Sequence, residues 1–168
     1  MKKNKILISS LILITILISR LIPHPPNFTN LLALSFYIPA ILGIRYIPIL
    51  LLSYVITDLL IGYHFTTHWI WGSIFLISLT SQFFSKKITS RIFGSTLGSI
   101  IFFILTNFGV WLSGMYELNI KGFLECFYLA IPFFKNTLIS TIFFSLMFEI
   151  IYKSFKNKLN FFKSRIKY

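Results

Sequence analysis

The sequence is short of charged residues, and this scarcity excludes an ordinary soluble domain. Charged residues make up 12% and hydrophobic residues 56% of the 168 residues, whereas a soluble domain has about 25% charged residues. Cysteine is also scarce: Cys126 stands alone, so no disulfide can form within the chain. A membrane span needs roughly 20 apolar residues. The chain therefore has room for about six spans and for no second domain.

Acidic residues are nearly absent, which leaves a formal net charge of +12 from 16 Lys and Arg. The four acids are Asp58, Glu117, Glu125 and Glu149. On a soluble protein this charge would suggest a nucleic-acid partner. Here the basic residues cluster at 2–5, 86–91 and 153–167, beside apolar runs. Anchoring at the cytoplasmic membrane face explains them, so we predict no nucleic-acid partner.

Motifs of common catalytic sites are absent as well. There is no HExxH pair, no carboxylate triad, no phosphate-binding loop and no hydrolase order of Ser, His and carboxylate. His64 and His68 would share a helical face, but no third ligand accompanies them. Asp58 and His64 are six residues apart, so one helix would not place an acid and base pair on one face. We predict a protein that is not an enzyme, with no metal ion and no cofactor.

The apolar runs predict an all-α fold, a polytopic membrane helix bundle in one domain over residues 1–168. The expected spans are 6–22, 31–44, 47–62, 69–84, 91–113 and 136–154, followed by a basic cytoplasmic tail at 155–168. The run 31–44 is short and contains Pro39. We expect it to be kinked or partly re-entrant and supported by neighbouring helices.

The basic residues also predict the orientation of the bundle. With the N-terminus inside, 13 of the 16 Lys and Arg lie on the cytoplasmic side. Because Lys and Arg resist translocation, both termini are expected to be cytoplasmic. The segment 123–134 has only 12 residues and contains Glu125 and Pro132, and a seventh span there would export the basic tail. We therefore expect an outer re-entrant or interfacial helix at 123–134.

The unusual polar residues gather on the outer side of this topology, where three connections can converge on one cavity. Asp58 lies inside an apolar run, and a carboxylate there costs several kcal/mol unless it is paired or hydrated. Arg20, at the outer end of the first helix, either pairs with Asp58 or binds an anion of a substrate. Aromatic side chains nearby, Trp111 and Tyr116 among them, either stack on a flat ligand or sit at the membrane interface.

Two smaller features allow both a structural and a functional interpretation. Cys126 is either a nucleophile or soft ligand for a cobalt- or copper-bearing compound, or a buried and unreactive side chain. Gly94 and Gly98 form a GxxxG pair that favours close packing within the bundle over recruitment of a partner.

Four outer motifs carry a resemblance to a known family. They are PHPPNF at 23–28, TDLLIGYH at 57–64, TNFGVW at 106–111 and IPFFKNT at 131–137. Over residues 20–141 the chain resembles a family of small, multi-pass bacterial inner-membrane proteins without an assigned function. That family is in turn similar to the S components of energy-coupling factor transporters, six-helix proteins that capture vitamins or metal ions from outside.

The resemblance implies a protein that binds a small micronutrient, a vitamin-type solute or a corrinoid, in an outward-facing cavity for uptake. A transmembrane coupling subunit with ATPases would supply the energy. The matching positions imply a pocket formed by His24, Asn27, Asp58, His64, Asn107, Trp111, Cys126 and Asn136, to which the outer placement adds Arg20 and Tyr116. Ser140 and Thr141 stand where the family often has Gly and Asp, which removes a carboxylate.

A second interpretation needs no ligand. The chain would be a non-transporting membrane scaffold or assembly factor whose outer motifs hold its own loops in place. The consecutive prolines of PHPPNF support it, because they stiffen a loop without a bound molecule.

Overall fold

The computed structural model describes residues 2–165, and all regular structure in this range is helical, as the sequence predicts. The α-helices are α1 (Lys2–Leu21), α2 (Leu31–Leu42), α3 (Ile47–Ile61), α4 (Thr67–Thr80), α5 (Ile88–Val110) and α6 (Ile120–Arg165). A 3-10 turn, Ile44–Tyr46, connects α2 to α3, and a π-helical turn, Trp111–Met115, follows α5. The first five expected spans agree with α1 to α5 to within about one helical turn.

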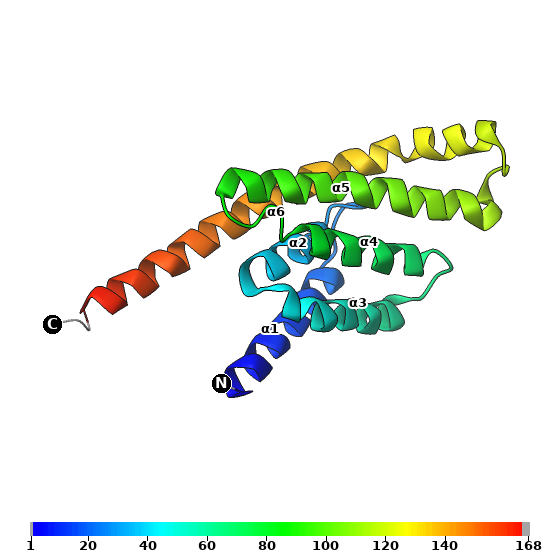
Figure 1. Ribbon diagram of the computed structural model, residues 1–168. Coiled ribbons are helices and arrows are strands. Elements are labelled where there is room, and N and C mark those ends of the chain that lie inside the picture. Colours follow the sequence, from blue (N-terminus) through cyan, green and yellow to red (C-terminus); the bar gives the residue numbers. More distant parts are fainter. Residues whose placement is uncertain (1, 166–168) are drawn as a thin grey trace.

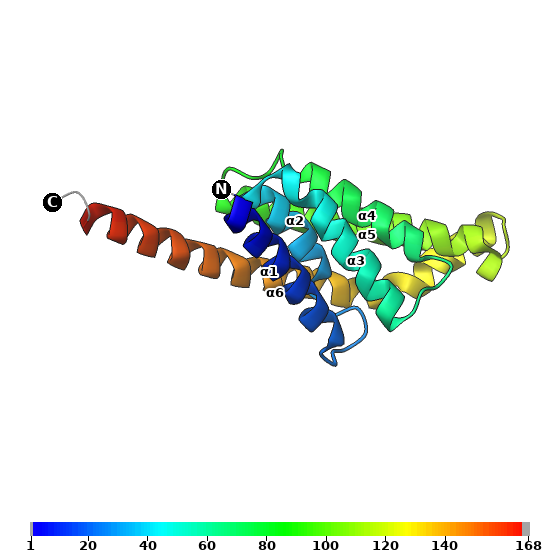
Figure 2. The same ribbon diagram turned by 90° about the horizontal axis from the view of Figure 1, so that it is seen from below.

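A long antiparallel hairpin of α5 and α6 forms one side of the bundle, and the shorter helices pack against it (Figure 1). α2 lies in the middle and contacts α3, α4, α5 and α6, whereas α1 packs mainly on α3. Two views at right angles place the N-terminus, the start of α5 and the far end of α6 at one end of the molecule (Figures 1 and 2). The connections α3–α4 and α5–α6 lie at the opposite end, so consecutive helices alternate in direction.

Three helical segments are long and apolar enough to cross a membrane: Ile44–Ile61, Ile88–Met115 and Ile120–Ser154. Large apolar side chains are exposed on them, for example Leu60 at 69% and Ile150 at 68%. An extended apolar surface of this kind is unfavourable in water and favourable against lipid tails. The fold is therefore that of a membrane protein.

The short helix α2 is buried by its neighbours, as we expected of the run that contains Pro39. Its 12 residues span about 18 Å, less than the roughly 30 Å of a hydrocarbon core. Residues 32–37 are all buried, because α3, α4, α5 and α6 all pack against α2. Buried helices of this kind need no polar face.

Gly94 and Gly98 let α5 approach α2 and α4 closely. A Cβ atom at Gly94 would lie 2.6 Å from Cβ of Phe84 and 2.7 Å from Cζ of Phe36. A Cβ atom at Gly98 would lie 3.0 Å from Cγ2 of Ile77. The expected packing role of the GxxxG pair within the bundle is confirmed.

The expectation of a separate outer helix at 123–134 is wrong, because one continuous helix, α6, runs from 120 to 165. Asn119 starts it: its Oδ1 accepts the backbone N–H of Gly122 at 2.9 Å, as an N-cap residue does. Pro132 lies inside the helix and removes only one backbone donor, a loss that packing on α5 offsets. Most of the expected tail is therefore helical, and residues 166–168 lie outside the described range.

Candidate functional site

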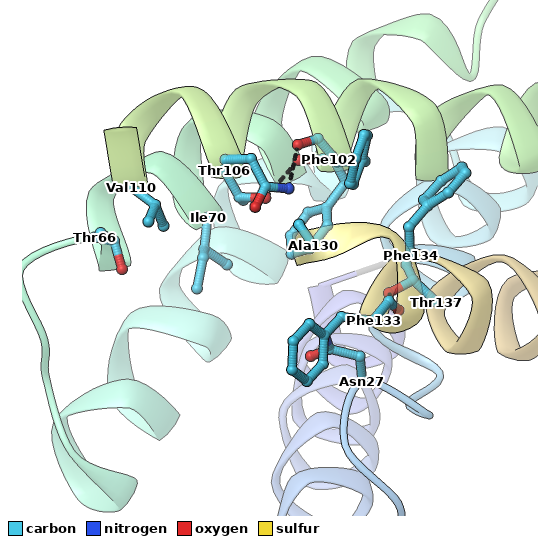
Figure 3. Close-up of a pocket in the computed structure, with 12 residues that line it drawn as sticks. Asn27, Thr66, Ile70, Phe102, Thr106, Val110, Ala130, Phe133, Phe134 and Thr137 are labelled. Carbon is cyan, nitrogen blue, oxygen red and sulfur yellow. Dashed lines mark hydrogen bonds between the residues drawn. The ribbon is translucent and has the colours of Figure 1, made fainter. Parts of the chain in front are cut away.

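A cavity of about 200 Å³ lies between α4, α5 and α6, and the connection between α1 and α2 closes it on one side (Figure 3). Its polar lining consists of amide and hydroxyl side chains: Asn27, Thr66, Thr106, Asn107 and Thr137. Four phenylalanines supply most of its apolar wall: Phe102, Phe103, Phe133 and Phe134. Residues from four separate parts of the chain thus face one space.

A second cavity, of about 300 Å³, adjoins the first and shares Asn27, Ile70, Phe102 and Thr137 with it. Its own polar lining adds Arg20, His24, Thr29 and Ser140. The predicted meeting of three connections at one cavity holds only in part: the α1–α2 connection and Thr66 of the α3–α4 connection line the cavities, whereas no residue of the α5–α6 connection does. The charge of Arg20 lies at the second cavity only.

Asn27 lies at the junction of the two cavities in an unusual backbone conformation. Its φ of 59° is in the left-handed region, which asparagine tolerates better than most residues. α6 holds this turn in place: Nδ2 of Asn136 donates to the carbonyl oxygen of Pro26 at 3.1 Å, and Oγ of Ser140 donates to that of Asn27 at 3.5 Å. Among the side chains described, those of residues 7–154, the amide of Asn27 has no hydrogen-bond partner, so it can meet a ligand.

The polar groups of α5 and α6 face the first cavity mainly as hydrogen-bond acceptors. Thr106 Oγ1 donates to the carbonyl oxygen of Phe102 at 2.7 Å, and Thr137 Oγ1 donates to that of Phe133 at 3.0 Å. Asn107 Nδ2 donates to the carbonyl oxygen of Phe103 at 2.7 Å. Each group has thus used a donor inside its own helix. The hydroxyl lone pairs and the Asn107 Oδ1 remain available to accept from a ligand.

Two of the cavity phenylalanines, Phe103 and Phe134, belong to a cluster of aromatic rings. The ring centroids of Phe103 and Phe134 are 4.6 Å apart, and Phe103 also meets Phe127 edge to face at 5.5 Å. Sequence reasoning had not singled out these side chains or the threonines Thr106 and Thr137. The sequence pointed to them only by position. Thr106, Phe134 and Thr137 lie in the TNFGVW and IPFFKNT motifs, and Phe103 lies shortly before the first motif.

Asp58 and Arg20 form the ion pair that was one of the two expected interpretations. Nη2 of Arg20 lies 2.5 Å from Oδ1 of Asp58, and Nε1 of Trp71 donates to Oδ2 at 2.6 Å. Nη1 of Arg20 donates to Oγ1 of Thr57 at 2.7 Å. Asp58 is buried and lies outside the linings of both cavities. The pair joins α1 to α3 and satisfies the carboxylate inside an apolar helix.

Cys126 is buried next to the site and does not line it. Its side chain is 2% exposed, and Sγ donates to the carbonyl oxygen of Asn107 at 3.4 Å. The burial that the structural interpretation expects of this cysteine is therefore confirmed, and a role as ligand for a cobalt- or copper-bearing compound finds no support. No group of three potential metal ligands occurs among the side chains that the structure describes.

The other predicted residues lie at the edge of the site or beyond it. His64 lies in the exposed α3–α4 connection, where its backbone N–H donates to Oγ1 of Thr67 at 3.1 Å. Nε1 of Trp111 donates to the carbonyl oxygen of Glu117 at 3.0 Å and braces the α5–α6 connection. Tyr116 lies in the same connection. Of the ten candidates, the cavities are lined by Arg20, His24, Asn27 and Asn107.

Comparison with known proteins adds one match. Residues 1–162, a range that includes both cavities, match the model of a family of unknown function, DUF6580. No curated protein and no solved structure matches the chain. A functional argument therefore has to come from the site itself.

Proposed function

We propose that the chain, which belongs to the DUF6580 family of unknown function, binds a small vitamin-type solute in an outward-facing cavity for uptake. The observation that supports this most is the meeting of amide and hydroxyl side chains from four chain segments around two adjoining cavities. Polar groups inside an apolar membrane bundle are costly and tend to be functional. Concave, largely apolar sites with a few polar groups are typical of small-molecule binding.

The lining restricts the chemistry of the solute. Volumes of about 200 and 300 Å³ lie at or below the low end of ligand pockets, which run from about 300 to 1,000 Å³. A corrinoid is too large for this space. The phenylalanine walls favour a flat ring, and the acceptors of Thr106, Asn107 and Thr137 favour N–H or O–H donors on it. Arg20, which is paired with Asp58, and His24 line the second cavity and would donate hydrogen bonds to an acceptor on the solute there.

We place the protein in the bacterial inner membrane as a multi-pass chain with both termini inside. Lys86, Lys87 and Lys153 lie at the end opposite the cavities, and Lys and Arg collect on the cytoplasmic side. The cavities then open toward the outside. Release of the solute inside would need a transmembrane coupling subunit with ATPases, the partner that the resemblance to S components implies.

Mass spectrometry on the full chain, purified in mild detergent, tests this proposal. The wild type is expected to carry a vitamin-sized molecule, and the isosteric double variant Thr106→Val, Thr137→Val to retain it about tenfold less. Loss of two hydrogen bonds of about 1 kcal/mol each gives at least this factor. Thr96→Val is the matched control: Thr96 lies on α5, donates to the carbonyl oxygen of Ile92 at 2.8 Å, and lines neither cavity.

Two results would contradict solute binding at this site. Equal retention by the double variant and the wild type would place the molecule elsewhere. The proposal would also be contradicted if the wild type gave a ligand-free spectrum and a panel of vitamins and their precursors did not raise its melting temperature.

The scaffold interpretation is the second candidate, because several outer contacts fix the protein's own loop. Asn136 and Ser140 hold the turn at Pro26 and Asn27, and Asp58 is fully engaged by Arg20 and Trp71. If the protein is a scaffold, Asn136→Ala lowers the melting temperature and no added solute restores it. If the protein is a binder, the solute that co-purifies restores most of the loss.

A further inference from the structure

We propose that the opposite, lysine-bearing end of the bundle binds one anionic phospholipid of the inner leaflet, with its phosphate in a basic pocket and one acyl chain in an adjoining apolar groove. The basic pocket has a volume of about 580 Å³ and lies between the α4–α5 connection, the first turn of α5 and α6. Lys86, Lys87 and Lys153 line it. This site is separate from the solute cavities and does not depend on the proposed uptake.

Few carboxylates are available to pair with these three lysines. The whole chain has four acidic residues. Asp58 pairs with Arg20, and Glu149 pairs with Arg91. Glu117 and Glu125 lie around the other end of the α5–α6 hairpin. No carboxylate side chain of the described residues is therefore left to neutralise the three lysines, and their charge can attract an external anion.

A rigid hydrogen-bonded cluster forms the wall of the pocket. Nε and Nη2 of Arg91 each donate to one carboxylate oxygen of Glu149 at 2.7 Å. Nη1 of Arg91 donates to the carbonyl oxygen of Ser85 at 2.8 Å, and the Tyr37 hydroxyl donates to Oε1 of Glu149 at 3.0 Å. Because the Glu149 carboxylate is already engaged, it competes little for the lysines. The pocket is thus formed before a ligand arrives.

An apolar groove of about 250 Å³ begins where the basic pocket ends. α2 and α6 form it with side chains that are almost all apolar: Leu34, Ile38, Ile41, Leu42, Phe148 and Ile151. Tyr152 lines both the groove and the basic pocket, and Cζ of Arg91 lies 5.4 Å from its ring centroid. Basic pockets between membrane helices on the cytoplasmic side suit lipid headgroups. The adjoining groove accounts for an acyl chain, which a free phosphate ion lacks.

Native mass spectrometry of the full chain tests the headgroup part of the proposal. Dipalmitoyl phosphatidylglycerol is compared with the phosphatidylcholine that has the same chains. We expect a clear preference for the anionic lipid, and a loss of about fivefold in its affinity for Lys87→Gln, since one lysine near an anionic lipid contributes about this factor. The triple variant Lys86→Gln, Lys87→Gln, Lys153→Gln is expected to lose roughly a hundredfold.

Arg45→Gln is the control for charge alone. Arg45 lies at the same end of the bundle, stacks on Tyr46 with Cζ 5.3 Å from the ring centroid, and lines no part of the basic pocket. Its variant is expected to bind the anionic lipid within about twofold of the wild type. An equal loss from Arg45→Gln and Lys87→Gln, or equal binding of the two lipids by the wild type, would overturn the proposal.

A second pair of variants tests the acyl chain. Ile151→Trp is expected to fill the groove and weaken binding of the dipalmitoyl lipid at least tenfold. Ile150→Trp is the matched control, because Ile150 is the preceding residue of α6, is 68% exposed and lies outside the groove. Both changes are at exposed positions, so both variants should fold. If glycerol phosphate or inorganic phosphate binds as tightly as the lipid, and Ile151→Trp changes nothing, the site takes a free phosphate and the lipid proposal is refuted.

Discussion

The ion pair between Arg91 and Glu149 should be costly to break from one side and much less costly to remove from both. Its two hydrogen bonds are each 2.7 Å long, and the two side chains are 8% and 7% exposed. Removing one member of a buried pair costs about 3–5 kcal/mol, because the remaining charge loses its compensation. We therefore expect Arg91→Met and Glu149→Leu each to lower the free energy of unfolding by about 3–5 kcal/mol.

The double variant Arg91→Met, Glu149→Leu leaves no uncompensated charge at this position. Its main remaining cost is the hydroxyl of Tyr37, which loses its acceptor on Glu149. An unsatisfied buried hydroxyl costs about 1–3 kcal/mol. The double variant should therefore lose about 1–3 kcal/mol, far less than the sum of the single losses. The resulting coupling energy between the two side chains is expected to be about 3 kcal/mol or more.

Equilibrium unfolding in mixed micelles with increasing sodium dodecyl sulfate measures these free energies. The fluorescence of Trp69 and Trp71, at the start of α4, and of Trp111, directly after α5, reports unfolding away from the substituted positions. Arg45→Met applies the same substitution to an exposed arginine at the same end and should stay within about 0.5 kcal/mol of the wild type. Single losses that simply add up to the double loss would refute the reasoning.

Two further predictions concern packing. Gly94→Ala should lower the free energy of unfolding by about 1–3 kcal/mol, because its Cβ would lie 2.6 Å from Cβ of Phe84. Gly72→Ala, which meets no atom within 4 Å in α4, should raise it by up to about 1 kcal/mol; equal effects would contradict the close approach. Cys126, which is 2% exposed, should react with a maleimide only after unfolding in detergent. A cysteine introduced by Leu124→Cys at a position 60% exposed should react at once, and equal rates would contradict the burial of Cys126.

The helices could be predicted because the apolar runs are long and the breaks between them are clear. The failure at 123–134 has a definite cause. Glu125 and Pro132 suggested a break, but the N-cap at Asn119 and the contact with α5 determine a single helix. A proline removes one hydrogen bond, and a long packed interface outweighs it. Local sequence patterns were sufficient to predict the helices, except at 123–134, where packing on α5 keeps the helix continuous.

The two ion pairs differ in how much of them the sequence revealed. Asp58 lies near the outer end of the expected span 47–62, and Arg20 lies near the outer end of the expected span 6–22. Their pairing could therefore be proposed from the topology. Arg91 and Glu149 are 58 residues apart, and Arg91 by itself resembled another cytoplasmic anchor. Its partner became visible only once α5 and α6 lay side by side.

The cavity residues were the least predictable part of the site, for an electrostatic reason. A charge inside an apolar bundle is stable only when it is fully paired. The carboxylate of Asp58, the most conspicuous polar residue, is accordingly bound by Arg20 and Trp71 and is not available to a ligand. Amides and hydroxyls cost less to bury, because a bond to their own helix satisfies part of their hydrogen-bonding capacity. Groups such as Thr106 can therefore face an open cavity and still offer an acceptor. In a bundle with few charges, the unremarkable threonines and asparagines are the side chains to examine first for binding, and the conspicuous charges are those to examine first for stability.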